Sequence, residues 1–193
     1  MPGELTFAVL ERSFAGRQPF TVGFDIDDTT LLSSFAFAYA DGVFEASGGP
    51  RYRDDLRYWT LVNDSLDGRF SRPKESIRPV IAMHAARGDT IVFVTGRHTS
   101  AIPSDRTSRL LMQLFGLASP PRVVFTERAP KAAFIRAVHP AVFYGDADAD
   151  IEDARAADPR IRAIRIIRGP CSTSSSPARP GRFGEEVLAG SAY

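Results

Sequence analysis

The stretch FTVGFDIDDT, residues 20–29, joins a short apolar run to a cluster of carboxyl side chains. The run Phe20–Phe24 is rich in residues that favour strands, and it ends at Asp25. Such a run is typical of a strand that is buried on both faces, as in a parallel sheet. Ligands bind at the carboxyl ends of strands in open α/β sheets, so we expect Asp25 and Asp27 at such an edge.

Other apolar runs of similar length and composition predict further buried strands, with helical patterns between them. The expected strands are 91–94, 123–125, 141–144 and 161–167, and the expected helices are 73–87, 106–115, 130–138 and 148–157. For the first of these helices we expect Ser71 as the N-cap and Pro73 in the first turn. Strands that alternate with helices predict right-handed βαβ units and a mostly parallel α/β sheet.

Two segments interrupt this alternation. Residues 31–69 are aromatic and rich in glycine, and we expect a small inserted cap of helices and loops there. Residues 169–181 are rich in Ser and Pro, which predicts a long surface loop. The 193 residues therefore suit a single domain, 1–193, that carries a cap at about 31–69.

Composition excludes several classes of partner. The 24 basic and 23 acidic residues give a net charge of +1, so we expect neither a nucleic-acid partner nor an anionic membrane surface. The single cysteine, Cys171, gives no internal disulfide and no multi-cysteine metal site. No run reaches the roughly 18 apolar residues of a membrane span. Residues 1–10 lack a secretory signal pattern, which leaves a cytoplasmic protein or a leader already removed.

Polar residues follow four of the predicted strands, at the edge where ligands bind. Asp25 can attack phosphorus while Asp27 handles the proton of the leaving oxygen. Carboxylates this close repel one another, so we expect a cation among them. Asp146 can complete a site made only of oxygen ligands, which favours Mg²⁺ over zinc. Thr95 and Lys131 can hold phosphate oxygens.

Each of these clusters also has a plainer interpretation. Aspartates after strands can be helix caps, Thr95 can be an N-cap, and Lys131 can be a solvated surface lysine. Their order along the chain and their shared position favour one phosphate site over four separate coincidences. The sequence has no Walker loop, no G-x-S-x-G elbow and no dinucleotide fingerprint.

The same residues resemble the motifs of the haloacid dehalogenase superfamily. The motifs lie at 22–29, 93–97, Lys131 and 143–151. A closer resemblance, to the bacterial class B non-specific acid phosphatases, extends from about Phe7 to Tyr193 and includes the stretches 70–75, 83–89, 183–187 and 191–193. It implies a haloacid dehalogenase-like Rossmannoid fold in three layers, with a small helical or loop cap.

The resemblance also implies roles for the site residues. Asp25 would be the nucleophile and a metal ligand, and Asp27 would be general acid and then base, with its backbone carbonyl on the metal. Asp146 would be the third protein ligand to Mg²⁺, and Asp150 would lie near metal-bound water. Lys131 would hold the phosphoryl oxygens.

Further roles follow for the rim of the site. Thr95 would also bind the phosphoryl oxygens, and Gly96 would offer a backbone amide. Arg97 would lie at the mouth of the site and orient the substrate. Phe37 and Trp59 match aromatic positions that line the leaving-group pocket.

The implied activity is hydrolysis of small phosphomonoesters such as nucleotides and aryl phosphates, with phosphotransfer when an alcohol competes with water. A periplasmic or secreted homotetramer is implied as well. Thr30 replaces an apolar residue of the family, and the loop 173–176 lacks a tyrosine that can close the pocket in relatives, so the leaving-group preference stays open. A specific 5′-nucleotidase, a phospho-accepting receiver domain and an inactive phosphate-binding protein remain as alternatives.

Overall fold

The computed structural model describes residues 4–193, and its centre is a parallel sheet. Within that range seven strands pair in the order β1-β9-β8-β7-β2-β5-β6, and every pairing is parallel. The strands are β1 (Glu4–Leu5), β2 (Thr21–Phe24), β5 (Thr90–Thr95), β6 (Arg122–Phe125), β7 (Val142–Gly145), β8 (Arg162–Ile166) and β9 (Glu186–Leu188). This confirms the expected α/β class and the five expected strands.

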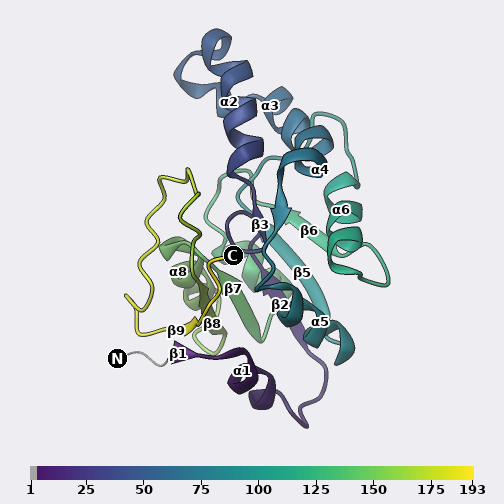
Figure 1. Cartoon of the computed structure of the whole chain (residues 1–193), viewed down its shortest axis with the longest axis vertical. Coiled ribbons are helices and arrows are strands. Elements are labelled where there is room, and N and C mark those ends of the chain that lie inside the picture. The colour runs from purple at the N-terminus through teal and green to yellow at the C-terminus, as the bar shows by residue number, and fades with distance from the viewer. Residues whose placement is uncertain (1–3) are drawn as a thin grey trace.

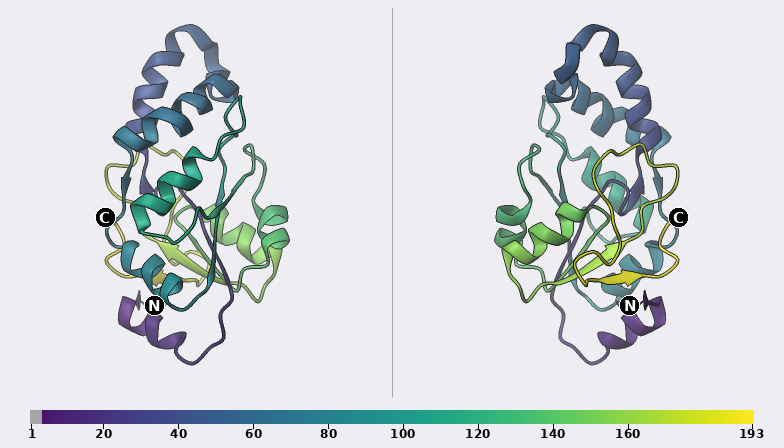
Figure 2. Two further views of the ribbon diagram at one scale, coloured as in Figure 1. Left: turned by 90° about the vertical axis from the view of Figure 1, so that its right-hand side faces the viewer. Right: turned by 90° about the vertical axis from the view of Figure 1, so that its left-hand side faces the viewer.

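Helices cover both faces of this sheet and give three layers (Figures 1 and 2). The helices are α1 (Phe7–Ser13), α5 (Arg78–Ala86), α6 (Arg106–Phe115), α7 (Ala132–Val138) and α8 (Asp148–Ala157). Alternate strand residues point to opposite faces. Phe24 and Phe93 therefore pack in one core with α1, α5 and α6, whereas Val92 and Phe143 pack in a second core with α7 and α8.

The helix expected at 73–87 begins later, at Arg78. Pro73 instead pairs with Leu31 in a two-stranded antiparallel sheet of β3 (Leu31–Leu32) and β4 (Arg72–Pro73). The expected N-cap role of Ser71 is wrong as well, because its hydroxyl donates to Asp67 Oδ1 at 2.6 Å. Pro79, in the first turn of α5, is the proline that marks the helix start.

Residues 34–70 form a helical cap above the carboxyl ends of the strands (Figure 1). It consists of α2 (Ser34–Gly48), the 3₁₀ helix η1 (Gly49–Asp54), α3 (Leu56–Leu61), the π-helical segment η2 (Val62–Leu66) and α4 (Asp67–Phe70). A third core of Ala36, Ala40, Tyr58, Trp59, Val62 and Leu66 holds it together. The cap is joined to the sheet through β3 and β4, so both connections enter close to the end of β2.

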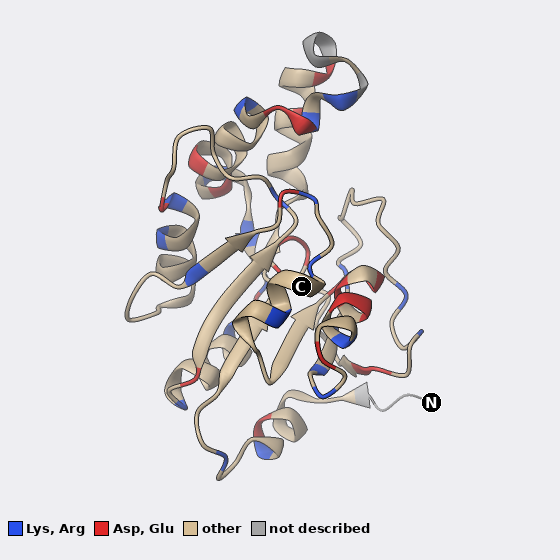
Figure 3. Cartoon of the chain, turned by 180° about the vertical axis from the view of Figure 1, so that it is seen from behind, with Lys and Arg blue, Asp and Glu red and all other residues tan. Residues whose placement is uncertain are grey.

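Residues 167–185 run from β8 to β9 without helix or strand and border the cap, where Thr173 donates its amide to Ser34 Oγ at 2.9 Å. Both signs of charge are interspersed along the chain (Figure 3), in keeping with the net charge of +1. Among residues 4–193, no helix combines the length and the apolar character that a membrane crossing requires.

Candidate active site

The ends of three adjacent strands bring the candidate residues together. β2 lies between β5 and β7, with Phe24 in register with Phe93 and Tyr144. Asp25 follows β2 directly, and Asp146 follows β7. Both carboxylates are buried, at 4% and 2% exposure. The apolar strands therefore place two acidic side chains at one edge, as their positions in the sequence predict.

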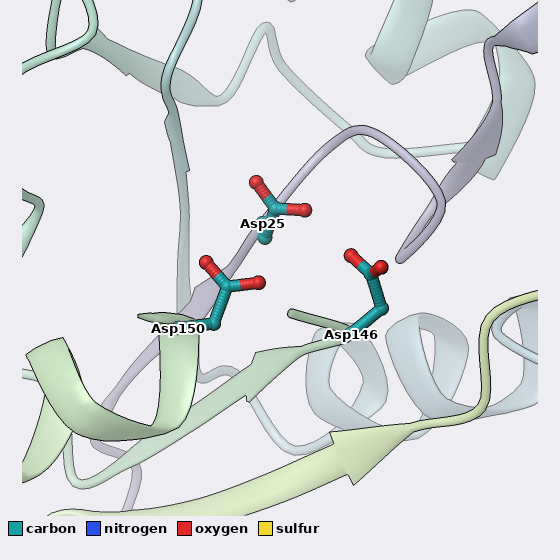
Figure 4. A group of neighbouring side chains, drawn as sticks. All are labelled: Asp25, Asp146 and Asp150. Carbon is teal, nitrogen blue, oxygen red and sulfur yellow. The ribbon is translucent and has the colours of Figure 1, made fainter. Parts of the chain in front are cut away.

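Three carboxylates form a cluster at this edge. Asp25, Asp146 and Asp150 each offer an oxygen atom, and these atoms lie within 4.8 Å of one another (Figure 4). Asp150 lies in the first turn of α8, where its Oδ2 accepts from the amide of Ala147 at 3.0 Å. Gly145 gives it room, because a Cβ at that position would overlap the Asp150 side chain. Asp150, expected beside the metal ligands, therefore reaches the cluster itself.

Lys131 provides the positive charge of the cluster. It lies at the start of α7, and its Nζ contacts Asp25 Oδ1 at 2.5 Å and Asp150 Oδ1 at 2.6 Å. Its backbone amide donates to Asp153 Oδ2 at 2.7 Å, which fixes the start of the helix. Burial alone would lower the pKa of Lys131, but the carboxylates of Asp150 and Asp25 raise it, so the ammonium stays charged.

The cluster keeps an excess of negative charge, because Lys131 and Arg168 offer two positive charges to three carboxylates. Burial raises the pKa of Asp25 well above its ordinary value, and the charges of Asp150 and Asp146 add to this against the opposing charge of Lys131. Burial, with the charge of Asp150, raises the pKa of Asp146 to about 6. A divalent cation between these oxygens would relieve the repulsion, and a donor set of oxygens without His or Cys fits Mg²⁺.

Asp27 points away from this cluster, towards Arg97. Arg97 Nε donates to Asp27 Oδ2 at 3.0 Å, and Arg97 Nη2 donates to Asp27 Oδ1 at 2.6 Å. Burial would raise the pKa of Asp27, but the charge and hydrogen bonds of Arg97 lower it. Arg97, expected at the mouth of the site, lines the smaller of two cavities beside Asp27; its side chain is 1% exposed and also pairs with Asp67 of the cap.

Thr95 and Gly96, which were predicted to contact phosphate, lie at the same edge of the sheet. Thr95 is fully buried, and its hydroxyl lies 3.5 Å from Asp27 Oδ2 and accepts from the amide of Arg97 at 3.3 Å. Gly96 lines the cavity beside them. The two residues predicted to contact phosphate therefore lie next to the predicted acid.

A cavity of about 620 Å³ opens above the cluster, between the cap and the 167–185 segment. Its lining includes Asp25, Lys131 and Asp146 on the floor and Phe37 on the cap. A smaller cavity of about 210 Å³ adjoins it and is lined by Phe37, Tyr58 and Trp59, among others. The rings of Phe37 and Trp59 meet edge to face, with centroids 6.1 Å apart. The two aromatic residues expected in the leaving-group pocket therefore lie together beside Asp27.

Sequence reasoning missed Arg168. Its Nε donates to Asp146 Oδ2 at 2.6 Å, and its Nη1 donates to backbone carbonyls of the Ser-rich loop. Arg168 follows the predicted strand 161–167 directly. The rule that ligands bind at the carboxyl ends of strands, which pointed to Asp25, therefore also indicates this position. A lone arginine before a long loop gives no chemical reason to single it out.

The fold is that of the haloacid dehalogenase-like hydrolases. A haloacid dehalogenase-like hydrolase from Streptococcus pneumoniae superposes with a TM-score of 0.57, covering 89% of this chain and 93% of that chain at 13% identity. A candidate β-phosphoglucomutase from Thermotoga maritima superposes with a TM-score of 0.52 at 13% identity, covering 89% of this chain and 94% of that chain. Likeness at such low identity shows the fold alone.

Comparison of the sequence with known families identifies the family within this fold. The model of the family described as HAD superfamily, subfamily IIIB (acid phosphatase) matches residues 4–173. Class B acid phosphatases of Klebsiella pneumoniae (strain 342) and Citrobacter rodentium (strain ICC168) are 39% and 38% identical, over 98% of this chain and 80% of each relative. The chain therefore belongs to this acid phosphatase family of the HAD superfamily and is a phosphomonoester hydrolase, which confirms the resemblance drawn from the motifs.

Proposed function

We propose that the chain is a magnesium-dependent acid phosphatase that hydrolyses phosphomonoesters through an aspartyl-phosphate on Asp25. The observation that carries this proposal is a cluster of three buried carboxylates, two of which contact the ammonium of Lys131. Lys131 Nζ lies 2.5 Å from Asp25 Oδ1, in a cluster that includes Asp146 and Asp150. Such a cluster at the floor of a cavity suits binding of a phosphate group together with a cation.

The carboxylates of Asp25 and Asp146 and the backbone carbonyl of Asp27 would hold the cation. A bound Mg²⁺ supplies positive charge that neutralises these carboxylates and the phosphoryl oxygens. Asp150 and Arg168 would orient the surrounding groups, since each contacts a member of the cluster. Catalysis would then rest mainly on positioning and on charge neutralisation.

The reaction would proceed in two displacements at Asp25. Its carboxylate oxygen attacks phosphorus, the bond to the ester oxygen breaks, and Asp27 gives that oxygen a proton. Arg97 keeps the pKa of Asp27 low without substrate, whereas the negative charge of a bound phosphate would raise it and favour the acid form. In the second step Asp27 takes a proton from water, which attacks phosphorus and frees Asp25. An alcohol in place of water would give phosphotransfer.

Thr95, the amide of Gly96 and Lys131 would hold the phosphoryl oxygens, while Phe37 and Trp59 would contact the leaving group. Nucleotides and aryl phosphates are the substrates that suit this cavity, because a flat ring can stack on aromatic side chains. The same aromatic pocket favours a specific 5′-nucleotidase as the second candidate. A receiver domain and an inactive phosphate-binding protein find no support in the family assignment.

The family resemblance extends the proposal to location and assembly. We propose a single catalytic domain, 1–193, with residues 31–69 as its cap, acting in the periplasm or after secretion, and assembled as a homotetramer. Light scattering on the purified protein tests the assembly: a mass near four times 21.1 kDa supports it, and a monomer contradicts it.

The activity is tested with p-nitrophenyl phosphate in the presence of MgCl₂ or EDTA. We expect turnover with MgCl₂, loss in EDTA, and recovery when excess MgCl₂ is added. Asp25→Asn should abolish turnover, whereas Asp105→Asn, at an exposed residue before α6, should leave it intact. Full turnover by Asp25→Asn, or in EDTA, contradicts the proposal.

A further inference from the structure

Lys74 occupies an unusual place for a lysine. It directly follows β4, where the chain returns from the cap to the sheet, and its side chain is completely buried. Lysines are almost never fully buried unless they are paired. Lys74 has no carboxylate within ion-pair distance among the described residues, and its partners are backbone carbonyls.

Three segments of the active site meet at Lys74. Its Nζ donates to the carbonyl of Asp28 at 3.1 Å and to the carbonyl of Ile167 at 2.6 Å. Its backbone amide donates to the carbonyl of Thr30 at 2.9 Å. One side chain therefore ties the root of the cap to the turn after β2 and to the end of β8.

Both carbonyls belong to segments that carry the chemistry. Asp28 lies in the turn of Asp25 and has a left-handed backbone, with φ of 59°, which costs energy in a residue other than glycine. Ile167 precedes Arg168, whose guanidinium contacts Asp146 Oδ2 at 2.6 Å. The ammonium thus holds the strained turn and the arginine at a set separation.

Stability alone does not account for this lysine. Burial lowers the pKa of Lys74 to about 8, against the opposing charges of Asp146 and Asp28, so keeping it charged at neutral pH costs free energy. Even a buried ion pair can often be replaced by apolar residues at no cost in stability, so a buried charge is weak evidence of a role in stability. The side chain of Lys74 donates only to segments that carry active-site residues. A charge that is buried at a cost in free energy at such a place is expected to have a role in the reaction.

We propose that Lys74 is a positioning residue of the phosphatase, which fixes the turn of Asp25 relative to Arg168 and Asp146. It does not touch the substrate and acts through the backbone of these segments. A displacement of about 1 Å in a reacting group can cost about a hundredfold in rate. The inference rests on the function proposed above, because it assumes that Asp25 and Asp146 act together.

The test compares Lys74→Met, which keeps the length of the side chain without the charge or the donors, with a matched control. Arg87 also donates to two backbone carbonyls, those of Phe14 and Arg17, and in addition pairs with the buried Asp89 at 3.0 Å. It lies before β5, at the opposite end of the strands. With p-nitrophenyl phosphate and MgCl₂, Lys74→Met should lower kcat by about 10–100-fold with KM within about threefold. Its melting temperature should fall no further than that of Arg87→Met, because each variant removes the donors of two backbone carbonyls.

Arg87→Met should lose thermal stability and keep its activity. It should melt about 4–10 °C lower, because backbone carbonyls lose their donors, with kcat within about twofold of wild type. A Lys74→Met protein with kcat within about twofold of wild type overturns the proposal, and so does an equal loss of kcat in both variants.

If Lys74→Met does not fold, Lys74→Gln replaces it, since the amide still donates to one carbonyl, and the same kcat criterion applies. Asp25→Asn separates the two proposals. If it is inactive while Lys74→Met has full activity, only the inference about Lys74 fails. If Asp25→Asn is active, the proposed function fails first.

Discussion

Replacing Arg97 with methionine tests the finding that this side chain is a buried link between the cap and the sheet. The guanidinium is 1% exposed and pairs with Asp27 on one side and with Asp67 on the other. Asp67 itself is fully buried. In Arg97→Met the Asp67 carboxylate keeps the hydroxyl of Ser71 as a donor and loses its charged partner.

The size of the effect follows from that burial. Removing one partner of a buried ion pair costs about 3–5 kcal/mol, because the remaining charge is left uncompensated. For a chain of this size each kcal/mol lowers the melting temperature by about 2–4 °C, so we expect a fall of roughly 6–20 °C. Adding Asp67→Asn should recover part of the loss, because the neutral amide is cheaper to bury.

Thermal unfolding of wild type, both single variants and the double variant gives the coupling free energy of the pair. Arg109→Met is the control: its partner is the exposed Asp105, so the melting temperature should change by less than about 2 °C. Additive losses for Arg97 and Asp67, or a melting temperature of Arg97→Met equal to that of the control, would refute the reasoning.

Three further results are expected. Lys131→Met should lower kcat for p-nitrophenyl phosphate by about 10²–10³-fold, because the charge that faces Asp25 is lost, and a near-wild-type rate would contradict this role. Gly145→Ala should lower kcat at least about tenfold, because its Cβ would displace Asp150, and unchanged kinetics would show that Asp150 need not stay in place. In EDTA, protonation of Asp146 should contribute thermal stability as the pH falls from about 6 towards 4, because its folded pKa is raised from 3.8 to about 6 and the folded state binds the extra proton in that window. Over this range the melting temperature of wild type should therefore rise relative to that of Asp146→Asn, and parallel curves for the two proteins would contradict this.

Local patterns were sufficient for the central strands and for the position of the site. Runs such as Phe20–Phe24 are short and apolar, as buried strands are, and they alternate with helical patterns. The ends of two such strands place Asp25 and Asp146 side by side. The short strands β1 and β9, at one side of the sheet, were not predicted, because two or three residues carry no periodic signal.

The environment of individual site residues depended on contacts between distant segments. The sequence gives no sign of the partners of Arg97, because Asp67 and Asn63 reach it from the cap, 30 and 34 residues earlier in the chain. The start of α5 was misjudged for a related reason. Pro73 resembles a helix start until its pairing with Leu31 is known, and that pairing joins residues on either side of the cap.

The covalent intermediate is the most direct test of the central claim. Rapid acid quenching during turnover of p-nitrophenyl phosphate, followed by peptide mass mapping, locates the phosphoryl group. The account predicts a phosphorylated peptide that contains Asp25 and is absent from Asp25→Asn. A phosphoryl group on another residue, such as His98, would contradict it.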